Sequence, residues 1–314
     1  MTLGDLGADV IKVERPEVGD ETRAWGPPFD DRGEAAYYLS INRNKLGVAL
    51  DLDLSGDREL LERLIQGADV VVDNYRRGTL ERKGLAPERF LTDIPRLIWC
   101  TITGFGPESD RPGYDYVVQA ESGWMAITGE RDGEPTKTGV ALADVTAGKD
   151  ATIAILGALV ARERAAAPLP VEARRLFVSL WHSATAALVN VAQNVLVSGR
   201  DAGRWGNAHP NLVPYQLFRA ADRHVVIAVG NDGQWQACCR ALGLESLGHD
   251  AALATNSGRL ANRARVVEAI ATRLAERPAR DDGRELVGGA ERGRGEEGEH
   301  TDVHRRHGAR MCRR

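Results

Sequence analysis

The sequence predicts an α/β fold, because short runs of branched apolar residues alternate with helical patterns along its first half. Four runs are expected to be strands, at residues 8–14, 47–51, 68–73 and 96–103. Turn residues flank each run, which is typical of strands buried in a mostly parallel sheet. Parallel strands joined through helices need right-handed crossovers, so we expect a doubly wound, mostly parallel, Rossmann-like large domain.

The helices of this half follow from apolar periodicity. Residues 55–66 place leucines and an isoleucine on one face, with Ser55 as a possible cap and Gly67 just past the end. Longer helices are expected at 144–164 and 179–196. Between them, residues 165–178 form an irregular stretch in which no element is predicted.

A smaller α+β domain is expected beyond a segment rich in Gly, Asn, His and Pro at residues 199–214. It should contain a strand at 224–229 and helices at 232–242 and 259–276. The predicted division is a large domain at 1–205, a small domain at 206–280 and a tail at 281–314.

The tail differs from the rest of the chain in composition. It is rich in Arg, Gly and acidic residues but has no aromatic residue, so it cannot bury a core and we expect disorder. An out-of-frame translation of a GC-rich gene would have this composition. Its histidines lack a rigid element to hold them, so no metal site is expected.

Overall composition limits the protein class. The chain has 314 residues, 43% apolar content and a net charge of −4, enough for one large or two ordinary domains and without bulk affinity for nucleic acid. Its longest apolar run, 151–161, is too short to cross a bilayer, and residues 1–14 do not resemble a secretory signal. We therefore expect a cytoplasmic protein with no membrane partner, whose four cysteines are reduced packing residues.

Two segments contain the residues that indicate chemistry. The first, residues 111–123, contains Tyr114, and the second, residues 139–148, contains Asp144 at the start of an apolar helix. An aspartate in this place can simply cap the helix. It can also be a nucleophile that carries an acyl group, and a helix N-terminus would keep it ionised.

Together with residues 4–15, these segments resemble the class III CoA-transferases of the CaiB/BaiF type. The resemblance spans about residues 1–280 and starts after the family's first strand and helix, so the large domain is expected to be CoA-binding and the small domain partial. It implies transfer of CoA from an acyl-CoA donor to a carboxylic acid acceptor through a covalent intermediate on Asp144. It also implies an interlocked homodimer, with coenzyme A or acyl-CoA as a substrate and no metal.

Tyr114 favours a transferase over the acyl-CoA racemases of the same fold, which the resemblance expects to carry a histidine there. Moving an α-proton needs a base that titrates near neutrality, and tyrosine is a poor one. The racemase remains an alternative through Asp115, and a truncated, inactive CoA-binding remnant is another. Tyr114 could also be a buried aromatic residue with a satisfied hydroxyl.

The resemblance further assigns a nucleotide-binding group and a loop. The residues expected to hold CoA are Arg15, Asn44, Lys45, Asn74, Tyr75 and Arg82. Their cations suit phosphates and the tyrosine suits adenine, although each cation could be an ordinary surface charge. The loop expected to cover the substrate consists of Gly230, Asn231, Asp232, Gly233 and Gln234, for which a plain strand-to-helix turn is the alternative.

A dinucleotide-binding fingerprint is excluded. Gly104 and Gly106 have the right spacing for its first two glycines, but Ser109 stands where the third is required. The sequence therefore does not predict a nicotinamide-dependent dehydrogenase, and it leaves open which acids exchange CoA.

Overall fold

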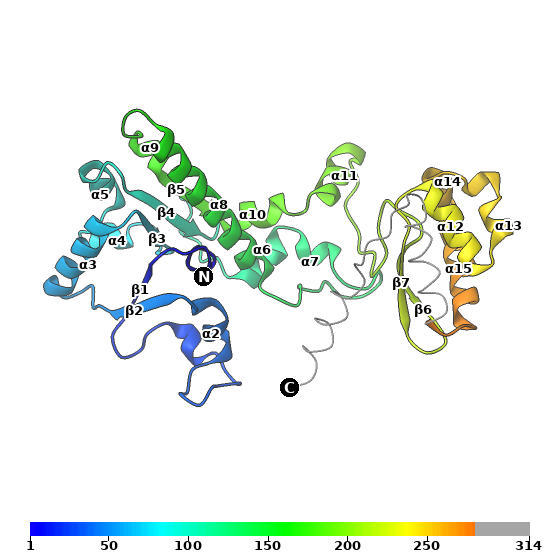
Figure 1. Ribbon diagram of the computed structural model, residues 1–314, viewed down its shortest axis with the longest axis horizontal. Coiled ribbons are helices and arrows are strands. Elements are labelled where there is room, and N and C mark those ends of the chain that lie inside the picture. The colour runs from blue at the N-terminus through cyan, green and yellow to red at the C-terminus, as the bar shows by residue number, and fades with distance from the viewer. Residues whose placement is uncertain (280–314) are drawn as a thin grey trace, which may run out of the picture. The chain divides into compact units, whose positions relative to one another are not determined.

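The computed structural model describes residues 1–279 and divides the chain into two compact units (Figure 1). Unit 1 comprises Met1–Arg204, and unit 2 begins at Trp205. The tail prediction at 281–314 lies outside the described residues. Mixed helices and parallel strands confirm the predicted α/β class.

Unit 1 contains two parallel sheets. In the first, β1 (Val10–Glu14) pairs with β2 (Lys45–Ala49), with Val10 opposite Lys45. The second has the order β3-β4-β5, formed by Val70–Asp73, Ile98–Thr103 and Arg175–Ser179. The four predicted strands exist with shifted ends. The segment 165–178, for which no element was predicted, contributes most of β5.

Helices cover both faces of the second sheet (Figure 1). On one face, α8 (Leu142–Arg164) packs Ala151 and Ile155 against Cys100 of β4. On the other, Trp99 of β4 joins the core cluster of α3 (Ser55–Gly67) and α5 (Pro87–Asp93). Adjacent residues of β4 thus face opposite layers, as period-two alternation requires. This is the arrangement of a doubly wound sheet.

The remaining helices of unit 1 are short, and one expected helix is divided. The predicted helix at 179–196 is divided into α10 (Leu180–Ala186) and α11 (Asn190–Ser198). They are separated at Val189, whose φ of 45° cannot continue a right-handed helix. The bounds are α1 Thr2–Asp5, η1 Glu21–Ala24, α2 Ala36–Asn42, α4 Thr79–Arg82, α6 Asp115–Glu121, α7 Trp124–Ile127, α9 Val171–Arg174, α10 Leu180–Ala186 and α11 Asn190–Ser198.

Unit 2 packs helices against an antiparallel pair of strands. The expected helix at 259–276 is wrong as a single element, because Asn262 leaves helical geometry and its side chain donates to the Gly258 carbonyl oxygen at 2.9 Å. Trp235, Ile270 and Leu274 lie in the core. The elements are β6 Tyr215–Arg219, β7 His224–Ala228, α12 Asp232–Leu242, α13 Glu245–Gly248, η2 Ala251–Leu253, α14 Asn256–Ala261 and α15 Arg263–Ala275.

The described residues contain neither a candidate membrane-spanning helix nor a candidate metal-binding cluster. None of the helices within 1–279 has the length and apolarity that crossing a membrane requires. Over the same range, His, Cys, Asp and Glu side chains form no group suited to holding a metal ion.

Candidate functional site

Asp144 lies in the first turn of α8, and it is not the cap of that helix. The helix begins at Leu142 with Ala141 as its N-cap, so Asp144 is the third helical residue. Antiparallel packing of α8 on the parallel sheet places this turn at the carboxyl end of β4 and β5. In doubly wound folds, ligands bind at that end of the sheet.

Asp115, the first residue of α6, caps α8 from another part of the chain. Its Oδ1 accepts a hydrogen bond from the Ala143 amide at 2.8 Å and lies 3.3 Å from the Asp144 amide. The alanine at position 141 has no side-chain oxygen to satisfy these amides. Asp115 therefore takes the role that an N-cap aspartate usually has.

The surroundings of Asp144 make its carboxyl group a weaker acid. Desolvation by the neighbouring protein, followed by the charge of Asp115, raises the pKa of Asp144 from its usual 3.8 to about 6. Asp144 is nevertheless exposed to solvent. The pKa is raised although a helix N-terminus favours negative charge, so desolvation and the charge of Asp115 outweigh that effect here. At neutral pH the carboxylate form still prevails.

Tyr37 of α2 is a neighbour that the sequence did not single out. Its pKa is raised by burial and then by the charges of Asp144 and Asp115. Its ring makes an edge contact with Trp25, with centroids 5.1 Å apart. The pair Tyr37-Tyr38 was visible in the sequence, but nothing local connects it to Asp144.

Tyr114 precedes α6 and is largely exposed, with 66% of its surface accessible. The alternative of a buried aromatic residue is therefore wrong. Its segment is held against the end of β4 where Gly104 and Gly113 cross, because a Cβ on Gly104 would lie 2.4 Å from the Gly113 Cα. This contact explains Gly104 without a dinucleotide.

The residues expected to hold CoA fall into separate places. Asn74, Tyr75 and Arg82 follow the carboxyl end of β3. Asp144 lies at the same end of the second sheet. Tyr75 is 44% exposed. Arg82 donates from Nη2 to the Thr79 hydroxyl group at 3.0 Å.

The other three residues expected to hold CoA lie at opposite ends of the first sheet. Arg15 follows the carboxyl end of β1, whereas Lys45 opens β2 opposite Val10 at the amino end. The structure thus does not bring Arg15 and Lys45 together. Asn44 has a φ of 59° and donates to Asp5 at 2.9 Å.

Lys45 has an environment that disfavours its charge. Burial, followed by the positive charge of Lys12, lowers its pKa. Its Nζ donates to Asn42 Oδ1 at 2.8 Å. Arg15, in contrast, lies on the surface with its Nη2 3.9 Å from a Glu21 carboxylate oxygen.

The loop at 230–234 connects β7 to α12 within unit 2. The backbone amide of Gln234 donates to Asn231 Oδ1 at 2.8 Å. The backbone amide of Gly230 donates to the side-chain oxygen Oε1 of Gln234 at 2.7 Å. Asp232 pairs at 2.9 Å with the guanidinium group of Arg259, which is fully buried. The loop is therefore a well-bonded strand-to-helix turn, and this is compatible with a role in binding.

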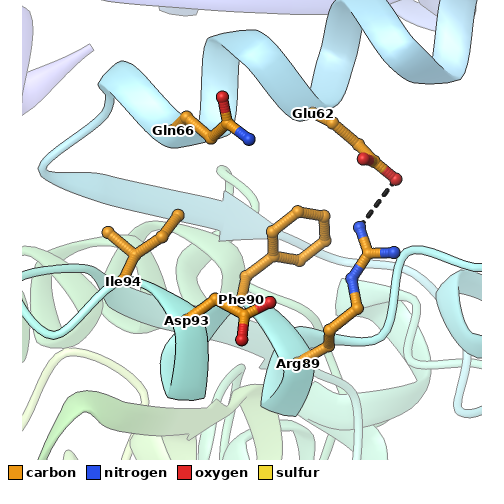
Figure 2. Close-up of a pocket in the computed structure, with 6 residues that line it drawn as sticks. All are labelled: Glu62, Gln66, Arg89, Phe90, Asp93 and Ile94. Carbon is orange, nitrogen blue, oxygen red and sulfur yellow. Dashed lines mark hydrogen bonds and ion pairs between the residues drawn. The ribbon is translucent and has the colours of Figure 1, made fainter.

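A shallow pocket lies elsewhere, between α3 and α5 (Figure 2). Its lining residues are Glu62, Gln66, Arg89, Phe90, Asp93 and Ile94. Figure 2 shows the ion pair across its mouth, in which Arg89 and Glu62 are 2.6 Å apart. No residue of the predicted site lines it, so Asp144 and its neighbours remain the candidate site.

Comparison with known proteins places this chain in a family. The sequence profile of CoA-transferase family III matches residues 1–286. A succinate–glutarate CoA-transferase of Agrobacterium fabrum is 44% identical over 89% of this chain and 70% of that protein. A succinyl-CoA:glutarate CoA-transferase of Mus musculus is 42% identical over 88% of this chain and 63% of the mouse protein. The chain thus spans about two thirds of the length of these relatives.

Solved structures agree with the sequence comparison. A CaiB/BaiF family protein from Brucella suis is 43% identical, with a TM-score of 0.75 over 91% of this chain and 76% of that one. Rv3272 of Mycobacterium tuberculosis has 30% identity and a TM-score of 0.77, covering 74% of that chain.

The chain belongs to CoA-transferase family III. The family, the fold and the CoA-transferase class that the sequence predicted are confirmed.

Proposed function

We propose that the protein transfers CoA from an acyl-CoA to a free carboxylic acid, with small dicarboxylic acids of the succinate and glutarate type as substrates. The relatives named for these acids support the substrate class. The observation that carries the proposal is the accessible carboxylate of Asp144 at the carboxyl end of the sheet, with its pKa raised to about 6. A carboxylate of this basicity is a better nucleophile than an ordinary one and is still ionised at neutral pH.

The chemistry divides into matched covalent steps. Asp144 attacks the thioester carbonyl carbon, the C–S bond breaks, and the CoA thiolate leaves a mixed anhydride behind. The thiolate then attacks the aspartyl carbonyl carbon, which releases the donor carboxylate and forms an aspartyl-CoA thioester. The acceptor carboxylate repeats these steps in reverse, and Asp144 is regenerated as a carboxylate.

Other groups have supporting roles in this proposal. Tyr114 shapes the site beside Asp144. Arg82, Asn74 and Tyr75 hold the nucleotide after β3, and Arg15, Asn44 and Lys45 contact other parts of CoA. The loop at 230–234 covers the substrate, no metal takes part, and the active form is a cytoplasmic homodimer.

The first prediction tests the nucleophile. Incubation with succinyl-CoA followed by hydroxylamine should modify Asp144, as seen by peptide mass spectrometry, and Asp144→Asn should abolish both labelling and turnover while CoA still binds. Asp150→Asn removes a carboxylate from the same helix and is the matched control. Full turnover by the Asp144 variant would overturn the assignment.

A further inference from the structure

Gln119 of α6 is a fully buried polar residue with no part in the chemistry described above. Only 1% of its surface is accessible. Its Nε2 donates to Asp115 Oδ2 at 2.6 Å, and its Oε1 accepts from the Thr138 amide at 2.9 Å. Both halves of the amide are used, one as a donor and the other as an acceptor.

Asp115 connects this buried amide to the start of α8. Oδ2 meets Gln119, while Oδ1 accepts from the amides of Ala143 and Asp144. The carboxylate group is thus fixed at both oxygens. The first turn of α8 is in turn fixed by it, because its amides have no local cap.

Gln119 also holds the segment that leads into α8. The Thr138 hydroxyl group lies 3.2 Å from Gln119 Oε1, and Gln119 Nε2 lies 3.4 Å from the Val140 carbonyl oxygen. The Gln119 side chain therefore contacts both Asp115 of α6 and the loop that precedes α8. Through Asp115, it is also connected to the helix that carries Asp144.

We propose that Gln119 and Asp115 act together as positioning residues for Asp144, orienting the helix turn from which it attacks and setting the charge beside it. This inference rests on the proposed role of Asp144. Neither residue needs to touch the substrate. A carboxylate held next to a second carboxylate is a stronger base, and a fixed turn keeps its approach to the thioester constant.

Other ionisable groups lie on the elements around α8. The charges of Asp144 and Asp115 raise the pKa of Tyr37 in α2 beyond the effect of its burial. Besides Asp115 and Tyr116 of α6 and Cys100 of β4, the ionisable groups on the elements packed against α8 are Asp5 of α1, which pairs with Arg43, Glu121 of α6, which pairs with Arg111, His182 of α10, and Arg175 of β5, which pairs with Glu88. Within the described residues, Asp115 is the charged group that raises the pKa of Asp144.

The test uses Asp115→Asn, Gln119→Glu and the control Asp150→Asn in the full chain. Asp115→Asn keeps an oxygen that can accept from Ala143 but removes the charge. The Asp144 carboxyl titration, followed by NMR and assigned with Asp144→Asn, should move from about 6 towards 3.8. The acid limb of kcat/KM should move the same way, while the KM for acyl-CoA stays constant.

Gln119→Glu keeps the length of the side chain and an acceptor for Thr138 but replaces the amide donor to Asp115 with a second acidic group, so it disturbs the contact that orients Asp115. We expect kcat to fall roughly ten- to a hundredfold with an unchanged KM for acyl-CoA. Gln119→Ala should lose at least as much kcat as Gln119→Glu. Gln119→Asn, which retains an amide group, should keep part of the wild-type kcat.

The NMR titration does not depend on turnover, so it separates this proposal from the proposed function. If Asp144→Asn retained activity, the function would be wrong while the titration could still show the coupling. A titration midpoint and kcat in Asp115→Asn and Gln119→Glu equal to those of Asp150→Asn would overturn the positioning role.

Discussion

Asp144 is an ionisable residue whose environment opposes its own charge. Its side chain lies in a helix N-terminal turn, where negative charge is favoured, yet desolvation and Asp115 raise its pKa. The sequence indicated Asp144 as a candidate nucleophile from the segment around it. It could not predict the sign of the pKa shift, because Asp115 is 29 residues away and its contact with α8 is tertiary.

The second prediction concerns stability and pH. The Asp144 carboxyl group has a pKa of about 6 in the folded state and 3.8, its ordinary value, in the unfolded state. Folding therefore favours its protonated form. Its effect on stability therefore becomes less favourable as pH rises from about 4 to 6, and constant above that. Asp144→Asn should gain thermal stability over the wild type across this range.

Calorimetric melting temperatures at pH 4, 5, 6 and 7 would measure that difference. Asp150→Asn controls for the loss of a carboxylate from α8. A gap between Asp144→Asn and wild type that narrows as pH rises would contradict the assigned shift.

The third prediction concerns the nucleotide. If Arg82 contacts a CoA phosphate, Arg82→Ala should weaken CoA binding by roughly 1–3 kcal/mol, the range of charge-assisted hydrogen bonds, and added salt should weaken wild-type binding. Isothermal titration calorimetry measures both effects. Arg63→Ala removes an exposed arginine from α3 and should leave affinity unchanged. Equal affinities in the two variants would place the phosphates elsewhere.

Strands with an uninterrupted apolar pattern could be predicted, whereas strands with polar ends could not. β4 has four consecutive buried residues, which the apolar run reveals. β5 begins with Arg175 and β6 ends with Arg219, so neither has the pattern of a buried strand. Each is defined by its pairing with a partner strand, and that information is not local.

The crossing of Gly104 and Gly113 was likewise outside the reach of sequence patterns. Each glycine lies in an ordinary turn context. Both glycines are required because their two backbone segments approach so closely that neither segment has space for a Cβ. The contact determines where α6 starts, and therefore where Tyr114 and Asp115 lie.

The fourth prediction follows from this crossing. Gly113→Ala places a Cβ 2.1 Å from the Gly104 Cα, so the segments must separate. We expect a loss of about 1–3 kcal/mol in unfolding free energy, as for other overpacked sites, and a lower kcat. Denaturant unfolding and initial rates check the two effects. At Gly139, a Cβ meets nothing within 4 Å, so Gly139→Ala is the control. Similar stabilities for both variants would contradict the argument.

At the scale of the molecule, unit 1 exposes several large apolar side chains, two of which are adjacent on α11. On α11, Leu196 is 77% exposed and Val197 is 78% exposed, and Ile153 of α8 is 67% exposed. Neighbouring apolar side chains on a protein surface usually mark a contact with another chain. This supports the homodimer that we propose.

The fifth prediction tests that assembly. Sedimentation velocity of the wild-type chain should show a dimer, and the double variant Leu196→Lys with Val197→Lys should shift it towards the monomer. Gln193→Lys adds a charge to another exposed position of the same helix and should leave the dimer intact. A wild-type chain that sediments as a monomer would refute the proposal, and an unshifted double variant would remove α11 from the interface.

The capping of α8 by Asp115 also has a consequence for the order of folding. A helix capped by its own sequence can complete its first turn as soon as it forms, but here the capping oxygen is 28 residues away from the amide it binds. Closing that loop costs chain entropy, which is recovered only when α6 docks on α8. The body of α8 can therefore form early, while the turn that carries Asp144 is completed late. Asp144 therefore acquires its raised pKa only when the tertiary structure is already in place.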